Sequence, residues 1–473
     1  MRPPFSFALF VLAGTSTLVS SERRAHAEAP SPIDAIESSV PASQTGGIVR
    51  RGPLRPTTTT ASLKACSFRH PICVHSASKS TSGAALMDVL ASAERAWDVA
   101  TGPLALPAPE PDLGTRAYDV YVVEPPATVG APPSVLAETV MGERDPRAAF
   151  DRASAFTLLD RRSAVAGCAL DAIVSRELTR AILYGVAPAT DEPVARAQTT
   201  YLAKLMVPCA AADLDGIDVF QAHPDHAIVD GWEESDEAVG RSYARGASLF
   251  WWWLDDAFGA APGAIVRATW SLQPTSTPLG AWRWNAEPDA FDVLRETFKG
   301  ALAAGSTLDD LLLEFAIARA FVGRTADDLH MAETRTLGDA AGARLDWDIP
   351  WPAQARRLAA REPTAPTGSA YLRVRCADVP KGSRLRVETA WEEHAKMRWA
   401  VVKLDAQGHE KARVVIPLAN PKVTEAQITV VELDDTDSVL LVGVNAGDPA
   451  FQVDPDDVVW EPHGWIVSLA SAQ

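Results

Sequence analysis

The hydrophobic pattern of this 473-residue chain changes near Pro363, Pro366 and Gly368, and this change limits the fold. Before it, apolar residues recur at spacings of three and four, as on one face of a helix. After it, short apolar segments alternate with polar residues between turn residues, which is typical of a β-sandwich. The sequence therefore predicts an α+β fold, with a mainly helical part in residues 62–362 and a C-terminal β-sandwich in residues 363–473.

Local signals give approximate bounds for the elements. Gly185 and Pro188 are expected to end a helix at Tyr184, and Ser306 followed by Asp309 predicts a capping box. The expected helices are 83–100, 163–184, 190–206, 241–258, 289–304 and 306–321. The expected strands are 118–123, 155–159, 371–376, 384–388, 399–404, 412–417, 427–431 and 439–444.

The first 27 residues have the layout of a secretory signal peptide. Arg2 precedes an apolar run at 5–19, and Ala25-His26-Ala27 forms a small-x-small cleavage site. Residues 28–61 are rich in Pro, Ser and Thr and predict a flexible leader. No segment after the signal reaches the roughly 20 apolar residues that cross a bilayer. We therefore expect an exported protein, periplasmic or extracellular, with no integral membrane segment in the mature chain.

The charge of the chain excludes one class of partner. The net charge is −17, and removal of the signal peptide, with three arginines and one glutamate, makes it more negative. An acidic protein of this kind is not expected to bind nucleic acid.

Five cysteines in an exported chain predict disulfide bonds. Cys66 and Cys73 are close in sequence, and Cys168 and Cys209 flank two predicted helices. We predict these two pairs, with Cys376 buried and free. An alternative is a zinc site that uses Cys66, His70, Cys73 and His75. An oxidising compartment makes that alternative the weaker one.

The segment Arg176-Glu177-Leu178-Thr179-Arg180 lies on the predicted helix 163–184. It has the layout of His-Glu-x-x-His, in which two histidines one turn apart hold zinc and the glutamate polarises water. A guanidinium group has no free lone pair and stays protonated, so neither arginine can bind a cation. The simpler alternative is a solvated helix whose charges pair along one face.

The order of these parts resembles secreted bacterial zinc metallopeptidases of the gluzincin type. The shared features are an exported leader, a cysteine pair, a short α/β segment, a helix at the His-Glu-x-x-His position, two further helices and a β-sandwich. The resemblance implies a third zinc ligand on the next helix, which falls by position on Arg196, or on Glu192 in a shifted register. It thus implies Arg176, Arg180 and Arg196 at the three ligand positions and Glu177 at the general-base position.

With all three ligand positions changed, the zinc expected for the family is predicted to be lost and no other cofactor is expected. A base without a metal-activated water has little peptide chemistry to perform, so we expect an inactive homologue. Three neighbouring arginines repel one another unless carboxylates or an anion join them. Candidate carboxylates are Glu177, Glu233, Glu234, Asp236 and Glu237.

The expected function is a secreted binding or structural protein whose partner is an unknown peptide, protein or small anion. One alternative is an active metal-dependent peptidase with a rearranged site, using His223 and His226 near Asp230. Another is a structural component of the envelope or matrix that acts through its β-sandwich.

Overall fold

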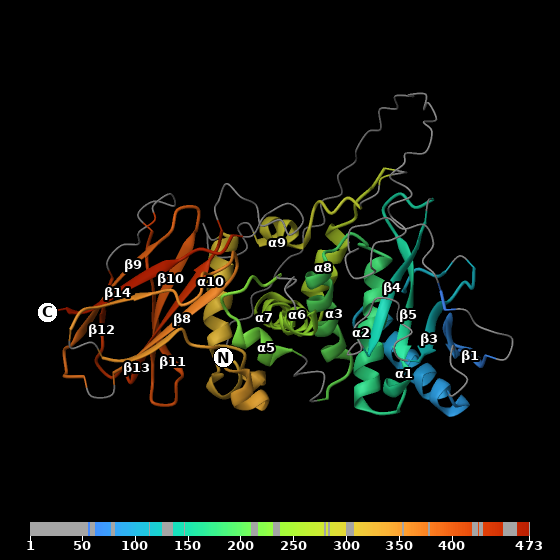
Figure 1. Cartoon of the computed structure of the whole chain (residues 1–473), viewed down its shortest axis with the longest axis horizontal. Helices are drawn as coiled ribbons and strands as arrows, with labels where there is room; N and C mark the ends of the chain where they lie inside the picture. Colours follow the sequence, from blue (N-terminus) through green and yellow to red (C-terminus); the bar gives the residue numbers. More distant parts are fainter. Residues whose placement is uncertain are drawn as a thin grey trace, which may run out of the picture. The chain divides into compact units, whose positions relative to one another are not determined.

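The computed structural model describes 16 segments of the chain (Figure 1). They are residues 55–56, 62–76, 81–112, 114–124, 136–145, 147–209, 216–229, 237–278, 281, 284–298, 307–351, 354–376, 379–418, 424, 429–447 and 461–472. The predicted signal peptide and nearly all of the predicted leader lie outside them. From Gly46 to Gln473 the chain forms one compact unit.

A five-stranded sheet occupies the first part of this unit. Its strands are β1 (Lys64–Cys66), β2 (Ile72–Ser76), β3 (Tyr118–Val123), β4 (Ala137–Arg144) and β5 (Ala153–Asp160), in the order β1-β2-β3-β5-β4. Strands β2, β3 and β5 are parallel, whereas β1 and β4 pair antiparallel at the two edges. Every residue of β3 is buried, so this apolar run forms the centre of the sheet.

Helices α1 (Gly83–Thr101) and α2 (Cys168–Tyr184) pack against this sheet (Figure 1). The later helices are α3 (Glu192–Met206), α5 (Ile217–Ala222), α6 (Glu237–Gly246), α7 (Ser248–Phe258), α8 (Ala264–Leu272), α9 (Ala290–Phe298) and α10 (Leu308–Ala320). Short 3-10 helices are η4 (Arg161–Ser163), η5 (Gly323–Thr325) and η6 (Ala332–Ala341). Within the described residues, no helix is both long and apolar enough to cross a membrane.

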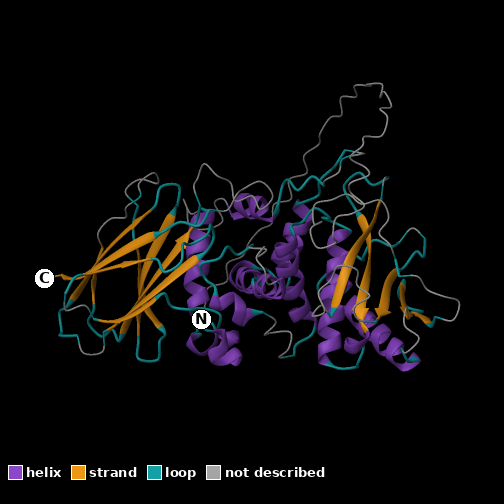
Figure 2. Cartoon of the chain, in the orientation of Figure 1, coloured by secondary structure: helices purple, strands orange, loops and turns teal. Residues whose placement is uncertain are grey.

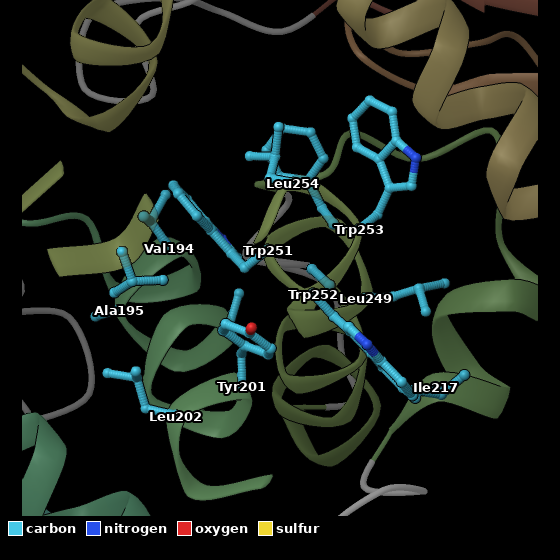
Figure 3. Close-up of a cluster of buried hydrophobic side chains, with 14 of the residues drawn as sticks. Val194, Ala195, Tyr201, Leu202, Ile217, Leu249, Trp251, Trp252, Trp253 and Leu254 are labelled. Carbon is cyan, nitrogen blue, oxygen red and sulfur yellow. The ribbon is translucent and has the colours of Figure 1, made fainter. Parts of the chain in front are cut away.

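Helix α7 lies in the core of the helical part. Residues Ser248–Asp255 are all buried, including three consecutive tryptophans. Trp251 lies on the side of α7 that faces Val194 and Tyr201 of α3 (Figure 3), and the Tyr201 hydroxyl donates a hydrogen bond to the Asp255 carboxylate. Large aromatic side chains on several faces of one helix bury much apolar area, and this burial stabilises the helical part.

The C-terminal residues form two sheets, drawn as orange strands in Figure 2. One has the order β11-β10-β13-β8-β6 and the other β12-β9-β14-β7. The bounds are β6 (Trp347–Pro350), β7 (Arg356–Ala359), β8 (Ser369–Arg375), β9 (Arg384–Trp391), β10 (Met397–Leu404), β11 (Glu410–Val415), β12 (Thr429–Glu432), β13 (Ser438–Asn445) and β14 (Trp465–Ala472). Side chains of both sheets share one apolar cluster, and Trp399 meets Trp465 edge to face at a centroid distance of 5.3 Å. The predicted α+β fold with a C-terminal β-sandwich is confirmed.

The first of these sheets also packs against helix α10. The Tyr371 hydroxyl of β8 donates to the backbone oxygen of Ala316, 2.8 Å away. Ala400, Val402 and Val442 belong to the same apolar cluster as the helices. Strand β13 is therefore covered on both faces, which explains why Val439–Asn445 is buried at every residue.

Three predicted helix positions were wrong in detail. The helix predicted from Ser163 begins at Cys168, because Gly167 takes a φ of +142° that interrupts the chain after η4. The helix predicted at 241–258 is two helices, α6 and α7. At the end of α6, a Cβ on residue 246 would lie 2.1 Å from the backbone oxygen of Gly216, so this close approach requires glycine. The capping box of α10 uses Thr307 and Asp310, one residue after the predicted pair.

Both predicted disulfides are present, Cys66–Cys73 and Cys168–Cys209, and Cys376 is buried and free as expected.

Candidate functional site

The predicted site lies on helices α2 and α3 beside strand β4. The Cys168–Cys209 disulfide joins the first residue of α2 to the chain just beyond α3. The Thr139 hydroxyl of β4 donates to the backbone oxygen of Glu177, 3.1 Å away. The disulfide thus ties the start of α2 to the chain after α3, and the Thr139 hydrogen bond holds the middle of α2 against the edge strand of the sheet.

Arg180 and Arg196 are joined by Glu192. The Arg180 side chain is 8% exposed, and its Nη2 pairs with Glu192 Oε2. The other oxygen of Glu192 pairs with Arg196, one helical turn further along α3. Arg180 Nε also donates to the Tyr184 hydroxyl at 2.9 Å. The structure therefore brings together Arg180 and Arg196, two of the three predicted ligand positions. They meet at Glu192, the alternative residue for the third position.

The charges of this cluster are strongly coupled. Burial alone would raise the pKa of Glu192, but the charges of Arg180 and Arg196 outweigh it and lower that pKa to about 2. Burial also acts to lower the pKa of Arg180, yet Glu192 and Tyr184 raise it well above its usual value. The pKa of Arg196 is lowered by burial, with Arg180 and Arg241 acting in the same direction. Glu192 is thus a fixed negative charge that the two arginines share.

The other two predicted residues, Arg176 and Glu177, form a looser pair. Arg176 Nε lies 3.4 Å from Glu177 Oε1. Glu177 is 4% exposed, and its Oε2 atom is buried with no hydrogen-bond partner among the described residues. Glu177 also interacts electrostatically with Arg180 and Arg196, so all four predicted residues belong to one charged cluster.

Glu138 of β4 belongs to the same cluster and was missed from the sequence. Burial raises its pKa, against the opposing charges of Arg180, Arg241 and Arg196. No periodic pattern had predicted a strand at 137–144, so nothing placed this carboxylate near α2. Only the pairing of β4 with β5 in the folded chain shows that Glu138 lies on a strand next to α2.

The chemistry available to this cluster is limited. Guanidinium groups fix and neutralise carboxylates, but they cannot supply the Lewis acid that lowers the pKa of an attacking water. Glu177 remains at the general-base position, and Glu138 is a second carboxylate of the same cluster. The arrangement suits a structural charge network better than hydrolysis.

A different group of residues has metal-ligand geometry. The ligand atoms of Cys73, His75 and Asp119 lie within 4.8 Å of one another and all three residues are buried. Cys73 is bonded to Cys66, however, and its sulfur cannot act as a thiolate ligand in that state. Asp119 accepts from His75 at 2.8 Å and from Arg55, within the predicted leader, at 2.7 Å.

The alternative zinc group Cys66, His70, Cys73 and His75 is not assembled. The two cysteines form a disulfide, and His70 pairs with Asp98 at 2.8 Å, away from the Asp119 that binds His75.

The alternative site at His223 and His226 places two imidazole rings 5.6 Å apart, edge to face. His226 Nε2 is 4.0 Å from the nearest Asp225 oxygen, and Asp225 pairs with Arg344. Asp230, Glu233, Glu234 and Asp236 lie outside the described residues, as does the side chain of Glu237. In the described part of the chain, these histidines do not belong to a three-ligand group.

The fold and the cluster define an α+β protein with an arginine–carboxylate network between two helices and a sheet edge. No family model and no curated protein matches the chain. Among solved structures, the pre-peptidase C-terminal domain of a collagenase from Bacillus anthracis is similar at 4% identity and a TM-score of 0.17, covering 28% of this chain and 99% of that one. The infectious bursal disease virus VP2 subviral particle is similar at 10% identity and a TM-score of 0.17, covering 24% and 32%. Scores this low bear on neither fold nor function.

Proposed function

We propose that this protein is an exported, catalytically inactive relative of zinc metallopeptidases that acts as a binding or structural protein. The observation that carries the proposal is the Arg180–Glu192–Arg196 bridge between α2 and α3. In this proposal the bridge replaces a metal ion as the link between the two helices. Glu192 itself supplies the anion that the arginines need, so no bound anion is required for charge balance.

Strand β4 supports a binding role. It is the last strand in the order of its sheet, so among the described residues one of its backbone edges has no partner strand. Peptides add to such edges through main-chain hydrogen bonds. Glu138 on β4 lies within electrostatic reach of Arg180 and Arg196, so the charged cluster includes a residue of this edge strand. A peptide or extended protein segment is the partner this arrangement fits best.

The two disulfides support export, because such bonds form and persist in oxidising compartments. The alternative of an active peptidase with a rearranged site has less support, since His223 and His226 lack a third ligand among the described residues. A structural role in the envelope or matrix is also consistent with a protein that is not a catalyst.

The test uses metal content and hydrolysis. Purified protein incubated with zinc and then desalted should hold no stoichiometric zinc and should cleave no peptide of a mixed fluorogenic set. The double variant Arg176→His/Arg180→His restores both histidines and keeps Glu192 in place, and it should gain about one zinc per chain because three ligands then converge. The matched control is Arg384→His/Arg386→His, on exposed arginines of β9.

Stoichiometric zinc or peptide cleavage by the unchanged protein would overturn the inactive assignment. If the folded double variant binds no more zinc than the control, the proposed relationship to metallopeptidases is wrong. The description of the arginine–carboxylate network would be unaffected.

A further inference from the structure

A buried histidine connects the helical part to the first C-terminal sheet. His330 Nδ1 is 2.7 Å from Asp327 Oδ1, and its Nε2 is 3.0 Å from Glu410 Oε2 at the start of β11. The side chains of His330, Asp327 and Glu410 are 4%, 7% and 5% exposed. The ring also stacks on Phe321 with the centroids 4.1 Å apart. All three ionisable groups are therefore out of water together.

This geometry matches the protonated form of the ring. A neutral imidazole has one N–H, whereas the imidazolium has two. Both ring nitrogens lie within ion-pair distance of a buried carboxylate oxygen, and only the imidazolium has the positive charge to pair with Asp327 and Glu410 at once. In the neutral form one nitrogen lone pair would face a buried carboxylate oxygen, and that oxygen would lose the favourable charge of the ring.

The surrounding charges favour the same form. Asp327 also accepts hydrogen bonds from the backbone N–H groups of Leu329, His330 and Glu410, at 2.9 to 3.0 Å. Arg413 of β11 pairs with Glu410 and with Glu314 of α10, each at 2.6 Å, and its Nη2 lies 3.4 Å from His330 Nε2. Three carboxylates thus face one arginine and one histidine. A proton on His330 reduces the excess of negative charge.

The pKa directions agree with this reading. Burial alone would lower the pKa of His330, but hydrogen bonds to Asp327 and Glu410 raise it above its usual value. Burial would raise the pKa of Asp327, but its hydrogen bond to His330 and the backbone donors lower it to about 2. The pKa of Glu410 is lowered as well, through His330 and Arg413 acting against burial.

We propose that His330 is a proton-controlled clamp: its imidazolium ring helps to hold β11 of the C-terminal sheet against the segment that follows α10, and loss of the proton weakens this contact. Glu410 and Asp327 lie on opposite sides of this contact, and the ring adds to two links that do not depend on its proton, from the Glu410 backbone N–H to Asp327 and from Arg413 to Glu314. The clamp is independent of the charge network on α2 and α3, and its failure would leave the proposed function unaffected.

The direction of the pH effect follows from the raised pKa. The stability that His330 contributes is fully present below its unfolded pKa of about 6.5 and is lost as the pH rises through the higher folded value. The two carboxylates have lowered pKa values, so their contribution is lost only in acid. The clamp is therefore closed below about pH 6.5 and opens as the pH rises through the raised pKa of His330.

Hydrogen exchange of the full chain tests the clamp. Peptides that cover 323–332 and 410–415 are followed in the unchanged protein and in His330→Gln, from about pH 6 to about pH 10, the range that brackets the titration. Each measured rate is divided by the chemical exchange rate expected for its own sequence at that pH, so the ratio of the corrected rates in the two proteins reports opening. We expect a ratio above tenfold at the acid end that falls towards one at the alkaline end, where the unchanged protein has also lost its clamp.

The matched control is His409→Gln, an exposed histidine next to the same strand whose nearest carboxylate oxygen, on Asp405, is 3.9 Å away. Its ratio should stay near one throughout. A His330→Gln ratio that does not change with pH would overturn the proposal.

A second variant keeps the test decisive if His330→Gln does not fold. Glu410→Gln removes one of the two charges that hold the proton but keeps an oxygen for Arg413. Histidine NMR should then show a lower pKa for His330 than in the unchanged protein, and exchange in 410–415 should accelerate at a lower pH. An unchanged His330 titration, or a neutral ring at about pH 6 in the unchanged protein, would contradict the clamp.

Discussion

Replacing Glu192 with glutamine tests the charge network between α2 and α3 most directly. The change keeps the shape and one oxygen acceptor but removes the charge that Arg180 and Arg196 share. A fall in pKa from 4.5 to about 2 corresponds to about 3.4 kcal/mol at 1.36 kcal/mol per unit. Since the Glu192 side chain is 33% exposed, solvent screens part of this, and we expect a loss of about 2 kcal/mol in the free energy of unfolding at neutral pH.

The pH dependence distinguishes this cause from a packing defect. Glu192 has a lowered folded pKa, so its stabilisation is present above the unfolded value of about 4.5 and is lost as the pH falls towards about 2. When Glu192 is protonated, Arg180 and Arg196 lose the negative charge that they share, as they do in Glu192→Gln. The unchanged protein and Glu192→Gln should therefore differ at pH 7 and converge in acid.

Urea unfolding at several pH values, followed by tryptophan fluorescence, measures this difference. The control is Glu432→Gln, because Glu432 on β12 is 71% exposed although it lies 3.2 Å from Arg384. An exposed pair of this kind contributes at most about 1 kcal/mol. If Glu192→Gln loses no more than the control, or loses the same amount at every pH, the network does not link the helices as described.

Two further predictions concern covalent links and packing. Serine substitution at Cys168 and Cys209, which are 41 residues apart, should reduce the free energy of unfolding by about 4 kcal/mol. The same change at Cys66 and Cys73, seven residues apart, should reduce it by about 2.4 kcal/mol, because the smaller loop restricts the unfolded chain less. Unfolding curves under oxidising conditions measure both losses, and equal losses would contradict the loop-entropy argument. Alanine at Gly443 places a Cβ 2.7 Å from a buried indole ring of β10. We expect overpacking to reduce the free energy of unfolding by about 1–3 kcal/mol. An unchanged denaturation midpoint would show that the sandwich core adjusts freely.

Local signals were sufficient for several elements. The predicted ends at Tyr184 and Met206 agree with the structure, whereas α2 and α3 begin at Cys168 and Glu192, five and two residues after the predicted starts. Strand β14 was missed although its buried residues Trp465, Val467 and Leu469 alternate as in other strands. That omission was avoidable, since the period-two pattern is present in the sequence.

Strand β4 could not be found in the same way. Its sequence contains Glu138, Gly142 and Arg144 and has no clear alternation, so it forms a strand because β5 provides backbone partners. With β4 unpredicted, Glu138 could not be placed near the arginines of α2 and α3.

The sequence by itself determined the α+β class, the change from helices to strands and the two cysteine pairs, because periodicity, caps and cysteine spacing are local properties of the chain. Only the tertiary structure decided that Glu192 joins Arg180 to Arg196, and that His330 lies between Asp327 and Glu410. Residue 330 is 80 positions from residue 410, and such partners meet only when helices and sheets pack. Charge pairing at that range depends on burial and orientation, which no local pattern encodes.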